Sequence, residues 1–212
     1  MALKEIYVVG LTNSGKRTFL SLISHAASED SRFEMSVRKG SGMVSGITSS
    51  LIRGKWPEDA EGDVSIDITY KKSFLKKTYR IYLKEIQNVN DKAGLYFSLK
   101  ASGLVFVIDA TKDSMKEEER LGVMIHNMKN ILGREPMPPS LIAITKCDLK
   151  NIDTPKEWVE ENYPIFLGEI KSKSPTWNVY SIQIYTENDL PARPLMADGP
   201  SMVLSWIAEK VR

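Results

Sequence analysis

The stretch YVVGLTNSGKRTFLSLI, residues 7–23, decides the fold. Its apolar start ends at Gly10, which is separated by four residues from Gly15 and followed by Lys16, in the pattern G-x-x-x-x-G-K. Glycines let the backbone wrap a phosphate, amide N–H groups point inward, and the N-terminus of the next helix adds positive potential. Because the pattern follows a strand signal and opens a helix signal, it predicts a phosphate-binding loop. The predicted phosphate-binding residues are Gly10, Asn13, Ser14, Gly15, Lys16, Arg17 and Thr18.

Arg17 occupies the position where such loops normally carry the Ser or Thr that binds Mg²⁺. A guanidinium has only donors and a permanent charge, so it cannot ligate a metal. Thr18 does not simply replace the hydroxyl, since one step along a helix rotates the side chain by about 100°. Three alternatives stay open: Arg17 faces solvent and Mg²⁺ is held weakly by water and phosphate, Arg17 partly substitutes for the cation, or Arg17 is an ordinary surface residue.

Strand and helix signals alternate along the rest of the chain. Apolar residues recur at three- and four-residue steps from Ser114 to Leu132, which predicts an amphipathic helix. The apolar run from Gly103 to Ala110 is typical of a strand covered on both faces. Further strands are predicted at 4–10, 64–74, 78–86, 139–148 and 177–185, and further helices at 16–27, 155–171 with a break at Pro164, and 200–211. This alternation predicts an α/β fold with a mostly parallel six-stranded sheet, one antiparallel hairpin edge (64–86) and helices on both faces.

A length of 212 residues predicts a single domain, 1–212, with insertions. The Gly- and Ser-rich segment 28–63 shows no sustained periodicity, so we expect it to be either partly structured or mobile. Residues 187–199 are rich in Pro, Asp and Gly and are predicted to form an inserted loop.

Composition excludes several classes of function. The formal net charge is only +2, and the basic cluster from Tyr70 to Arg80 is better explained as a solvated hairpin end than as a patch for nucleic acid or lipid. Cys147 is the single cysteine, which favours a reducing, cytoplasmic location and a buried, inert thiol. No apolar run approaches about 18 residues, so any membrane association is expected to be indirect. His25 and His126 lack partners at metal spacing, which argues against zinc.

A second motif, TKCD at residues 145–148, ends a predicted buried strand. A carboxylate at Asp148 can accept two hydrogen bonds from the N1 and N2 groups of guanine, while the stem of Lys146 can lie along the purine face. Alone this tetrapeptide is a weak signal. Combined with the phosphate loop it predicts a guanine site that includes Thr145, Lys146 and Asp148.

At this point the chain resembles the Ras-like small GTPases, most of all the branch of Arf, Sar and the β-subunit of the signal-recognition-particle receptor. The resemblance is carried by GLTNSGK, SGLVFVIDATKDS, LIAITKCD and WNVYSIQIYTEND, together with SMVLSWIAEKV, and covers most of the chain. It implies a Ras-like domain in which 28–63 is an insertion in the first switch region. It also implies a backbone contact to guanine from the loop after the last strand, which matches Tyr185 and Thr186, although their large side chains depart from the family pattern.

The resemblance implies degraded switch motifs. The family's Asp-x-x-Gly falls on Glu85 and Asn88, and the position of the water-orienting Gln falls on Val89, with Gln87 two residues earlier. Loss of that Gly removes a backbone N–H that meets the terminal phosphate. Thr48 is the candidate for the Thr of the first switch, the alternative being an ordinary polar loop residue.

These features together predict a switch or scaffold that binds GTP or GDP and works through protein partners, with weak or absent hydrolysis, because both the metal and the water-aiming group are in question. Two alternatives stay open. One is an active GTPase or ATPase completed by a partner, and the other is a nucleotide-free pseudo-GTPase that serves as an interaction module. Trp56, in a polar stretch near the first switch region, is expected to be either a core residue or an anchor for a partner.

Overall fold

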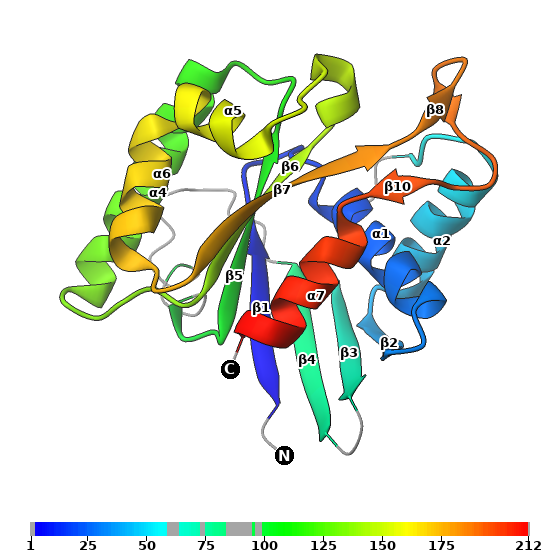
Figure 1. Ribbon diagram of the computed structural model, residues 1–212, viewed down its shortest axis with the longest axis horizontal. Coiled ribbons are helices and arrows are strands. Elements are labelled where there is room, and N and C mark those ends of the chain that lie inside the picture. Colours follow the sequence, from blue (N-terminus) through cyan, green and yellow to red (C-terminus); the bar gives the residue numbers. More distant parts are fainter. Residues whose placement is uncertain (1–2, 59–63, 73–74, 84–94, 96–98, 212) are drawn as a thin grey trace.

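The computed structural model describes residues 3–58, 64–72, 75–83, 95 and 99–211. Its main sheet has eight strands in the order β10-β7-β6-β5-β1-β4-β3-β2 (Figure 1). These are β1 (Lys4–Val9), β2 (Phe33–Lys39), β3 (Ser65–Lys72), β4 (Leu75–Leu83), β5 (Gly103–Asp109), β6 (Ser140–Thr145), β7 (Trp177–Ile184) and β10 (Ala197–Asp198). A separate pair consists of β8 (Thr186–Glu187) and β9 (Leu190–Pro191).

The sheet is parallel in its centre and antiparallel at both edges. Strands β4, β1, β5, β6 and β7 run parallel, whereas β3 and β2 on one side and β10 on the other run antiparallel to their neighbours. The prediction of a mostly parallel sheet with an antiparallel hairpin is therefore confirmed, but the prediction of six strands is wrong. The two additional strands, β2 and β10, each form an edge of the sheet.

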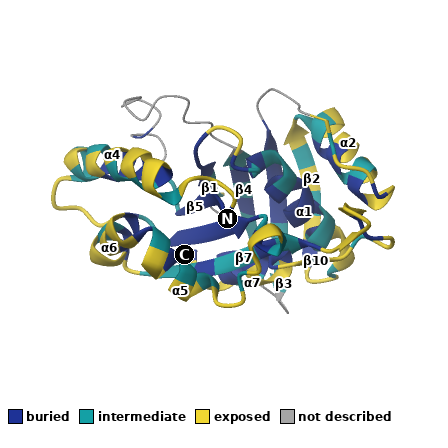
Figure 2. Ribbon diagram, turned by 90° about the horizontal axis from the view of Figure 1, so that it is seen from above, coloured by how far each residue is buried: buried dark blue, intermediate teal, exposed yellow. Residues whose placement is uncertain are grey.

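Helices lie on both faces of the sheet, as predicted (Figure 1). One face carries α1 (Lys16–Glu29), α2 (Ser41–Ile52) and α7 (Pro200–Lys210), and the other carries α4 (Ser114–Leu132), α5 (Pro155–Asn162) and α6 (Pro164–Lys173). Successive residues of a strand point to opposite faces, so Val8 joins the core under α1 while Val9 joins the core under α4. Figure 2 shows the buried strands between helices whose outer sides are exposed. Within the described residues, no helix combines the length and apolarity needed to cross a bilayer.

Long periodic signals predicted their elements closely. The helix α4 has the predicted bounds, Ser114–Leu132, and Pro164 separates α5 from α6 because its ring cannot continue a helix. The hairpin β3–β4 has the register Thr69↔Thr78, and the two hydroxyl oxygens are 3.1 Å apart.

The segment 28–63 contains regular structure that the sequence did not reveal. Strand β2 pairs with β3, and α2 packs on α1 through the buried Val44, Ile47 and Leu51. These three residues follow a helical spacing, but the surrounding Gly and Ser residues have low helix propensity and conceal the pattern.

The segment 187–199, predicted as a loop, also contains strands. Asn188 (φ 51°) and Asp189 (φ 61°) both lie in the left-handed region between β8 and β9. A two-residue connection with positive φ at both positions is the tight turn that matches the twist of a hairpin. The chain then returns to the main sheet as β10.

Candidate functional site

The loop between β1 and α1 has the curled backbone that its glycines predict. A Cβ on Gly10 would lie 2.5 Å from the carbonyl oxygen of Val107 and 2.8 Å from Ser14 Oγ, so only glycine fits there without displacement. Asn13 (φ 62°) and Gly15 (φ 81°) are left-handed, which turns the chain back toward the helix start at Lys16. A curled backbone of this kind can aim successive N–H groups at an anion, which is the geometry that the predicted phosphate-binding loop requires.

Lys16 is 3% exposed and lies across this loop. Its Nζ donates to the carbonyl oxygens of Gly10 at 3.1 Å and Leu11 at 2.6 Å, and lies 3.4 Å from Ser14 Oγ. The ammonium is therefore already held at the concave side of the loop, where an outer phosphate could exchange with a carbonyl partner.

Thr145, at the end of β6, joins the predicted guanine motif to the phosphate loop. Its Oγ1 lies 2.9 Å from the carbonyl oxygen of Ser14 and 3.1 Å from that of Ile108, so the hydroxyl can donate to either. A Cβ on Gly15 would come within 3.3 Å of the same Oγ1. Packing at Thr145 therefore fixes where the phosphate loop sits relative to β5 and β6.

Lys146 is positioned by a carboxylate that sequence reasoning missed, Asp109 at the end of β5. Lys146 is left-handed (φ 59°), and its Nζ lies 2.6 Å from Oδ2 of the fully buried Asp109. The Oδ1 atom accepts hydrogen bonds from the N–H and the hydroxyl of Thr111, at 2.9 and 2.7 Å. Burial raises the pKa of Asp109, but these hydrogen bonds and the Lys146 charge outweigh it, so the pKa lies below its ordinary value. The signal for this residue was an acid ending an otherwise apolar strand.

Two adjoining cavities lie beside these residues. The first, of about 370 Å³, is lined by Gly15, Thr18, Phe19, Leu22, Trp56, Pro57, Thr111, Thr145, Lys146, Asp148, Leu149, Ile182 and Ile184. The second, of about 340 Å³, is lined by Asn13, Ser14, Gly15, Lys16, Arg17, Thr18, Ile47, Pro57, Glu58 and Lys146. Four residues line both: Gly15, Thr18, Pro57 and Lys146.

The first cavity is largely apolar with one acid, Asp148, whose pKa is raised by burial, and we call it the base cavity. The second is built on the phosphate loop, and we call it the phosphate cavity.

The structure brings together the predicted residues of the two main motifs but not all the others. Tyr185 and Thr186 line neither cavity, and the Tyr185 N–H donates to the carbonyl oxygen of Met196 at 3.0 Å. Thr48 lies half-buried in α2 and also lines neither cavity, whereas its neighbour Ile47 lines the phosphate cavity. Glu85 and Asn88, with Gln87 and Val89, lie outside the described residues.

Sequence reasoning missed the apolar floor and the outer wall of the site. Ile182 and Ile184 of β7, with Phe19 and Leu22 of α1, line the base cavity, although nothing distinguishes them from core residues in the sequence. The segment 53–58, between α2 and the point where the described chain breaks, adds Trp56, Pro57 and Glu58. Trp56 was noticed, but as a core residue or partner anchor.

Among the described residues that line the phosphate cavity, the oxygen groups that could ligate Mg²⁺ include one carboxylate. The lining residues with side-chain oxygens are Asn13, Ser14, Thr18 and Glu58, of which only Glu58 is a carboxylate, whereas Arg17, which also lines the cavity, offers only donors. Across the described part of the chain, no three His, Cys, Asp or Glu residues form a group that could hold a metal on their own. A cation here would therefore depend on the phosphates of a ligand for much of its coordination.

Comparison with known proteins gives similar structures but no family. No family model matches the sequence, and no curated protein matches it significantly. One similar structure is a GTP-binding protein of the hyperthermophilic archaeon Sulfolobus solfataricus in complex with GDP, at 15% identity and a TM-score of 0.45 over 84% of this chain and 46% of that one. Another is an ADP-ribosylation-factor-like GTP-binding protein, or small COPII coat GTPase SAR1, from Encephalitozoon cuniculi in complex with GDP, at 15% identity and a TM-score of 0.42 over 84% of this chain and 68% of that one.

This chain spans about half the length of the archaeal protein. At these identities and TM-scores, neither protein determines what this chain binds. The class of protein that its own fold defines is an α/β domain with a mostly parallel sheet, helices on both faces and a curled loop with glycines at its first strand–helix junction.

Proposed function

We propose that this chain binds a guanine nucleotide, GTP or GDP, and acts as a small-GTPase-like switch or scaffold for protein partners. The observation that carries the proposal is the pair of adjoining cavities, which share Gly15 and Lys146 and end at the phosphate loop on one side and at Asp148 on the other. A nucleoside diphosphate has the same division into a flat, largely apolar base and an anionic tail.

The phosphates would be held by the amide groups of the loop 10–18 and by Lys16, which would exchange its loop carbonyls for phosphate oxygens. The base would lie in the apolar cavity, with the Asp148 carboxylate accepting from N1–H and N2–H₂ of guanine. Adenine presents no such pair of donors at that edge, so it would leave the half-buried carboxylate desolvated and unmatched. We assign the guanine contacts to Thr145, Lys146 and Asp148. A contact from Tyr185 or Thr186 would require the Tyr185 amide to leave Met196.

We propose further that hydrolysis is slow or absent. Phosphoryl transfer to water needs a cation that neutralises developing charge and a group that aims the water. Arg17 cannot ligate a cation, and Thr48 lies in α2 away from the lining of the phosphate cavity. The role would then be to hold nucleotide and change partner affinity rather than to turn over GTP quickly.

One observation favours a second candidate, a GTPase completed by a partner. Glu58 lines the phosphate cavity, and its carboxylate could ligate a cation or orient water in a site that a partner completes. Release of inorganic phosphate from GTP, measured for the protein alone and with a cell extract depleted of nucleotides, distinguishes the two candidates. Acceleration by the extract that Glu58→Gln abolishes would favour the second.

The proposal is tested by what the purified protein carries. We expect denaturation of freshly purified protein to release GDP or GTP, and the Lys16→Ala variant to release far less, because it loses the ammonium that the outer phosphates require. Release of adenine nucleotide would contradict the guanine assignment. Absence of any nucleotide, combined with no binding of added GDP, would favour the interaction module without nucleotide.

A further inference from the structure

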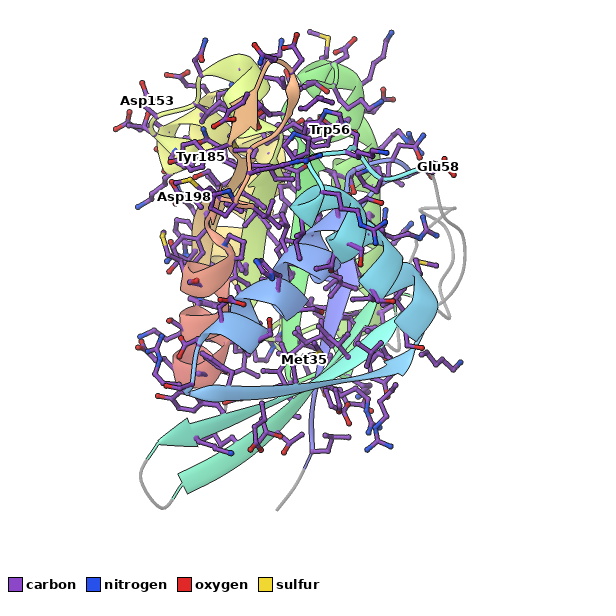
Figure 3. All side chains as sticks on the ribbon, turned by 90° about the vertical axis from the view of Figure 1, so that its right-hand side faces the viewer. Met35, Trp56, Glu58, Asp153, Tyr185 and Asp198 are labelled. Carbon is purple, nitrogen blue, oxygen red and sulfur yellow. The ribbon has the colours of Figure 1, made fainter. Side chains whose placement is uncertain are left out.

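Trp56 lies in the segment 53–58 and forms part of the wall of the base cavity. It lines this cavity together with Pro57, and the same cavity contains Lys146 and Asp148. The indole is 46% exposed, so it is neither a core residue nor fully in solvent. Figure 3 shows Trp56 beside the hairpin β8–β9, with Glu58 farther along the same segment.

Hydrogen bonds tie this segment to the hairpin β8–β9, which lies more than a hundred residues away in the sequence. The indole Nε1–H of Trp56 donates to the carbonyl oxygen of Asp189 at 2.8 Å. The guanidinium of Arg193, just after β9, donates to the carbonyl oxygen of Arg53. Two bonds at opposite ends of a four-residue stretch hold that stretch in one position.

The backbone of the segment comes very close to the hairpin at Gly54. A Cβ there would meet Nε of Arg193 at 2.5 Å and the carbonyl oxygen of Pro191 at 3.0 Å, and its φ of 67° is itself left-handed. Gly54 is therefore needed both for the turn after α2 and for contact with the hairpin.

The hairpin continues directly from the floor of the base cavity. The cavity-lining Ile184 ends β7, and the next residue is Tyr185, whose carbonyl oxygen accepts from the Ala192 N–H at 2.8 Å and whose N–H donates to the Met196 carbonyl oxygen at 3.0 Å. The turn at Asn188 and Asp189 then presents the Asp189 carbonyl to Trp56. Residues 184–193 thus form part of the floor of the base cavity and also bind the segment 53–58, which forms part of its wall.

We propose that Trp56 is a roof over the purine of the bound nucleotide, and that residues 186–193 are a brace that sets how long the nucleotide stays bound. This inference rests on the proposed function. A purine in the base cavity presents a flat π-face, against which an indole is the most favourable side chain. The nucleotide leaves when the segment 53–58 lifts, and lifting it breaks the bonds to Asp189 and Arg193.

The test is the dissociation rate of fluorescently labelled GDP chased by excess unlabelled GDP. We expect Trp56→Ala to raise the rate about tenfold or more through lost base stacking. Trp56→Phe keeps an aromatic ring but loses the indole donor, and Arg193→Ala removes the other bond, so each should raise the rate by about two- to fivefold. The association rates should change little. Thermal unfolding without nucleotide checks that the variants are folded.

Two controls separate the brace from a general loss of stability. Arg32→Ala removes an exposed arginine that pairs with Asp30 away from both cavities, and it should leave the rate unchanged. In the Trp56→Ala background, Arg193→Ala should raise the dissociation rate of GDP almost no further, because the brace slows dissociation by holding Trp56 over the purine. Tryptophan fluorescence should respond to GDP in the wild type and much less in Trp56→Phe.

Unchanged dissociation rates in folded Trp56→Ala and Arg193→Ala, in a protein that binds GDP, would overturn the roof and brace but leave the proposed function intact. Additive effects of the two substitutions would overturn the brace. Failure of the wild type itself to bind labelled GDP would instead contradict the proposed function, and the roof with it.

Discussion

Asp148 is half-buried in the base cavity, and burial raises its pKa, so a ligand that satisfies this carboxylate gains more than it would at the surface. Asp109 is in the opposite situation, since Lys146 and Thr111 already satisfy it. The two carboxylates, at the same end of the sheet, thus differ in whether protein groups already satisfy them. Asp109 positions Lys146, and Asp148 is available to a base.

We expect Asp148→Asn to weaken GDP binding about a hundredfold, because it replaces charge-assisted hydrogen bonds and places an amide N–H₂ against the N2 donor of guanine. The same variant should bind xanthosine diphosphate better than the wild type does, since xanthine carries a carbonyl at that position. Competition against labelled nucleotide measures both affinities. Equal loss for both nucleotides would argue that Asp148 acts only on the local fold.

Arg17 predicts a weak dependence on magnesium. We expect a chelator to change the GDP affinity of the wild type little, and to change that of Arg17→Thr more, because the new hydroxyl can ligate the cation beside the phosphates. Titrations with and without Mg²⁺ measure this difference. A strong loss of wild-type affinity with chelator would show that other oxygens, such as those of Thr18 or Glu58, already hold the metal.

At the scale of elements, the start of α4 carries two neighbouring acids that face different surroundings. Glu117 is 8% exposed, with its Oε2 3.3 Å from the hydroxyl of Tyr163. Its pKa is raised by burial and further by the Asp109 charge. Glu118 instead accepts hydrogen bonds from the backbone N–H groups of Ile165 at 2.7 Å and Phe166 at 3.4 Å, at the start of α6.

We expect Glu118→Ala to lower the free energy of unfolding at pH 7 by about 1 kcal/mol, because the start of α6 loses a carboxylate that caps its N–H groups.

We expect Glu117→Gln, in contrast, to raise the free energy of unfolding at pH 7. Between the ordinary pKa of Glu117 and its raised folded value, the native state binds more protons than the unfolded state. Stability of the wild type is thus lost as pH rises through that window. The gain from Glu117→Gln should consequently grow with pH in urea titrations. A gain that is equal on both sides of the window would contradict the raised pKa.

Elements differed in how far the sequence could predict them. Helix α4 and strands β5 and β6 were predictable, because burial imposes long periodic or continuous apolar patterns on them. Helix α2 was missed because Gly and Ser dilute its three buried apolar residues, and β10 because two residues carry no pattern. The turn at Asn188 and Asp189 did carry a local signal, since Asn and Asp tolerate positive φ.

The sequence predicted the two motifs of the candidate site but not the apolar residues around them. Both motifs could be found because phosphate and guanine recognition need particular residues at particular spacings, and the structure places Gly15, Lys16, Thr145, Lys146 and Asp148 around the two cavities. The roof and floor could not be found. Trp56 and Ile184 come to line the same cavity only through tertiary structure, and apolar residues in a cavity have the same sequence pattern as apolar residues in a core.

At the scale of the whole molecule, the residues of the candidate site lie at the carboxyl ends of the central parallel strands. Gly10, Asp109, Thr145 and Ile184 follow or end four neighbouring parallel strands, β1, β5, β6 and β7, at their carboxyl ends. Ligands of open α/β sheets bind outside the carboxyl ends of the strands. The edge strands β2 and β10 lie at opposite ends of the strand order, yet the segment 53–58 after α2 and the brace before β10 come together where the indole of Trp56 donates to the carbonyl oxygen of Asp189.

Calorimetric titration of the nucleotide-free protein with GDP and with ADP tests most directly whether the two cavities together hold a guanine nucleotide. We expect one site per chain that binds GDP at least about a hundredfold more tightly than ADP, because only guanine satisfies the half-buried carboxylate with two donors. Equal affinities for the two nucleotides, or no heat with either, would contradict the claim.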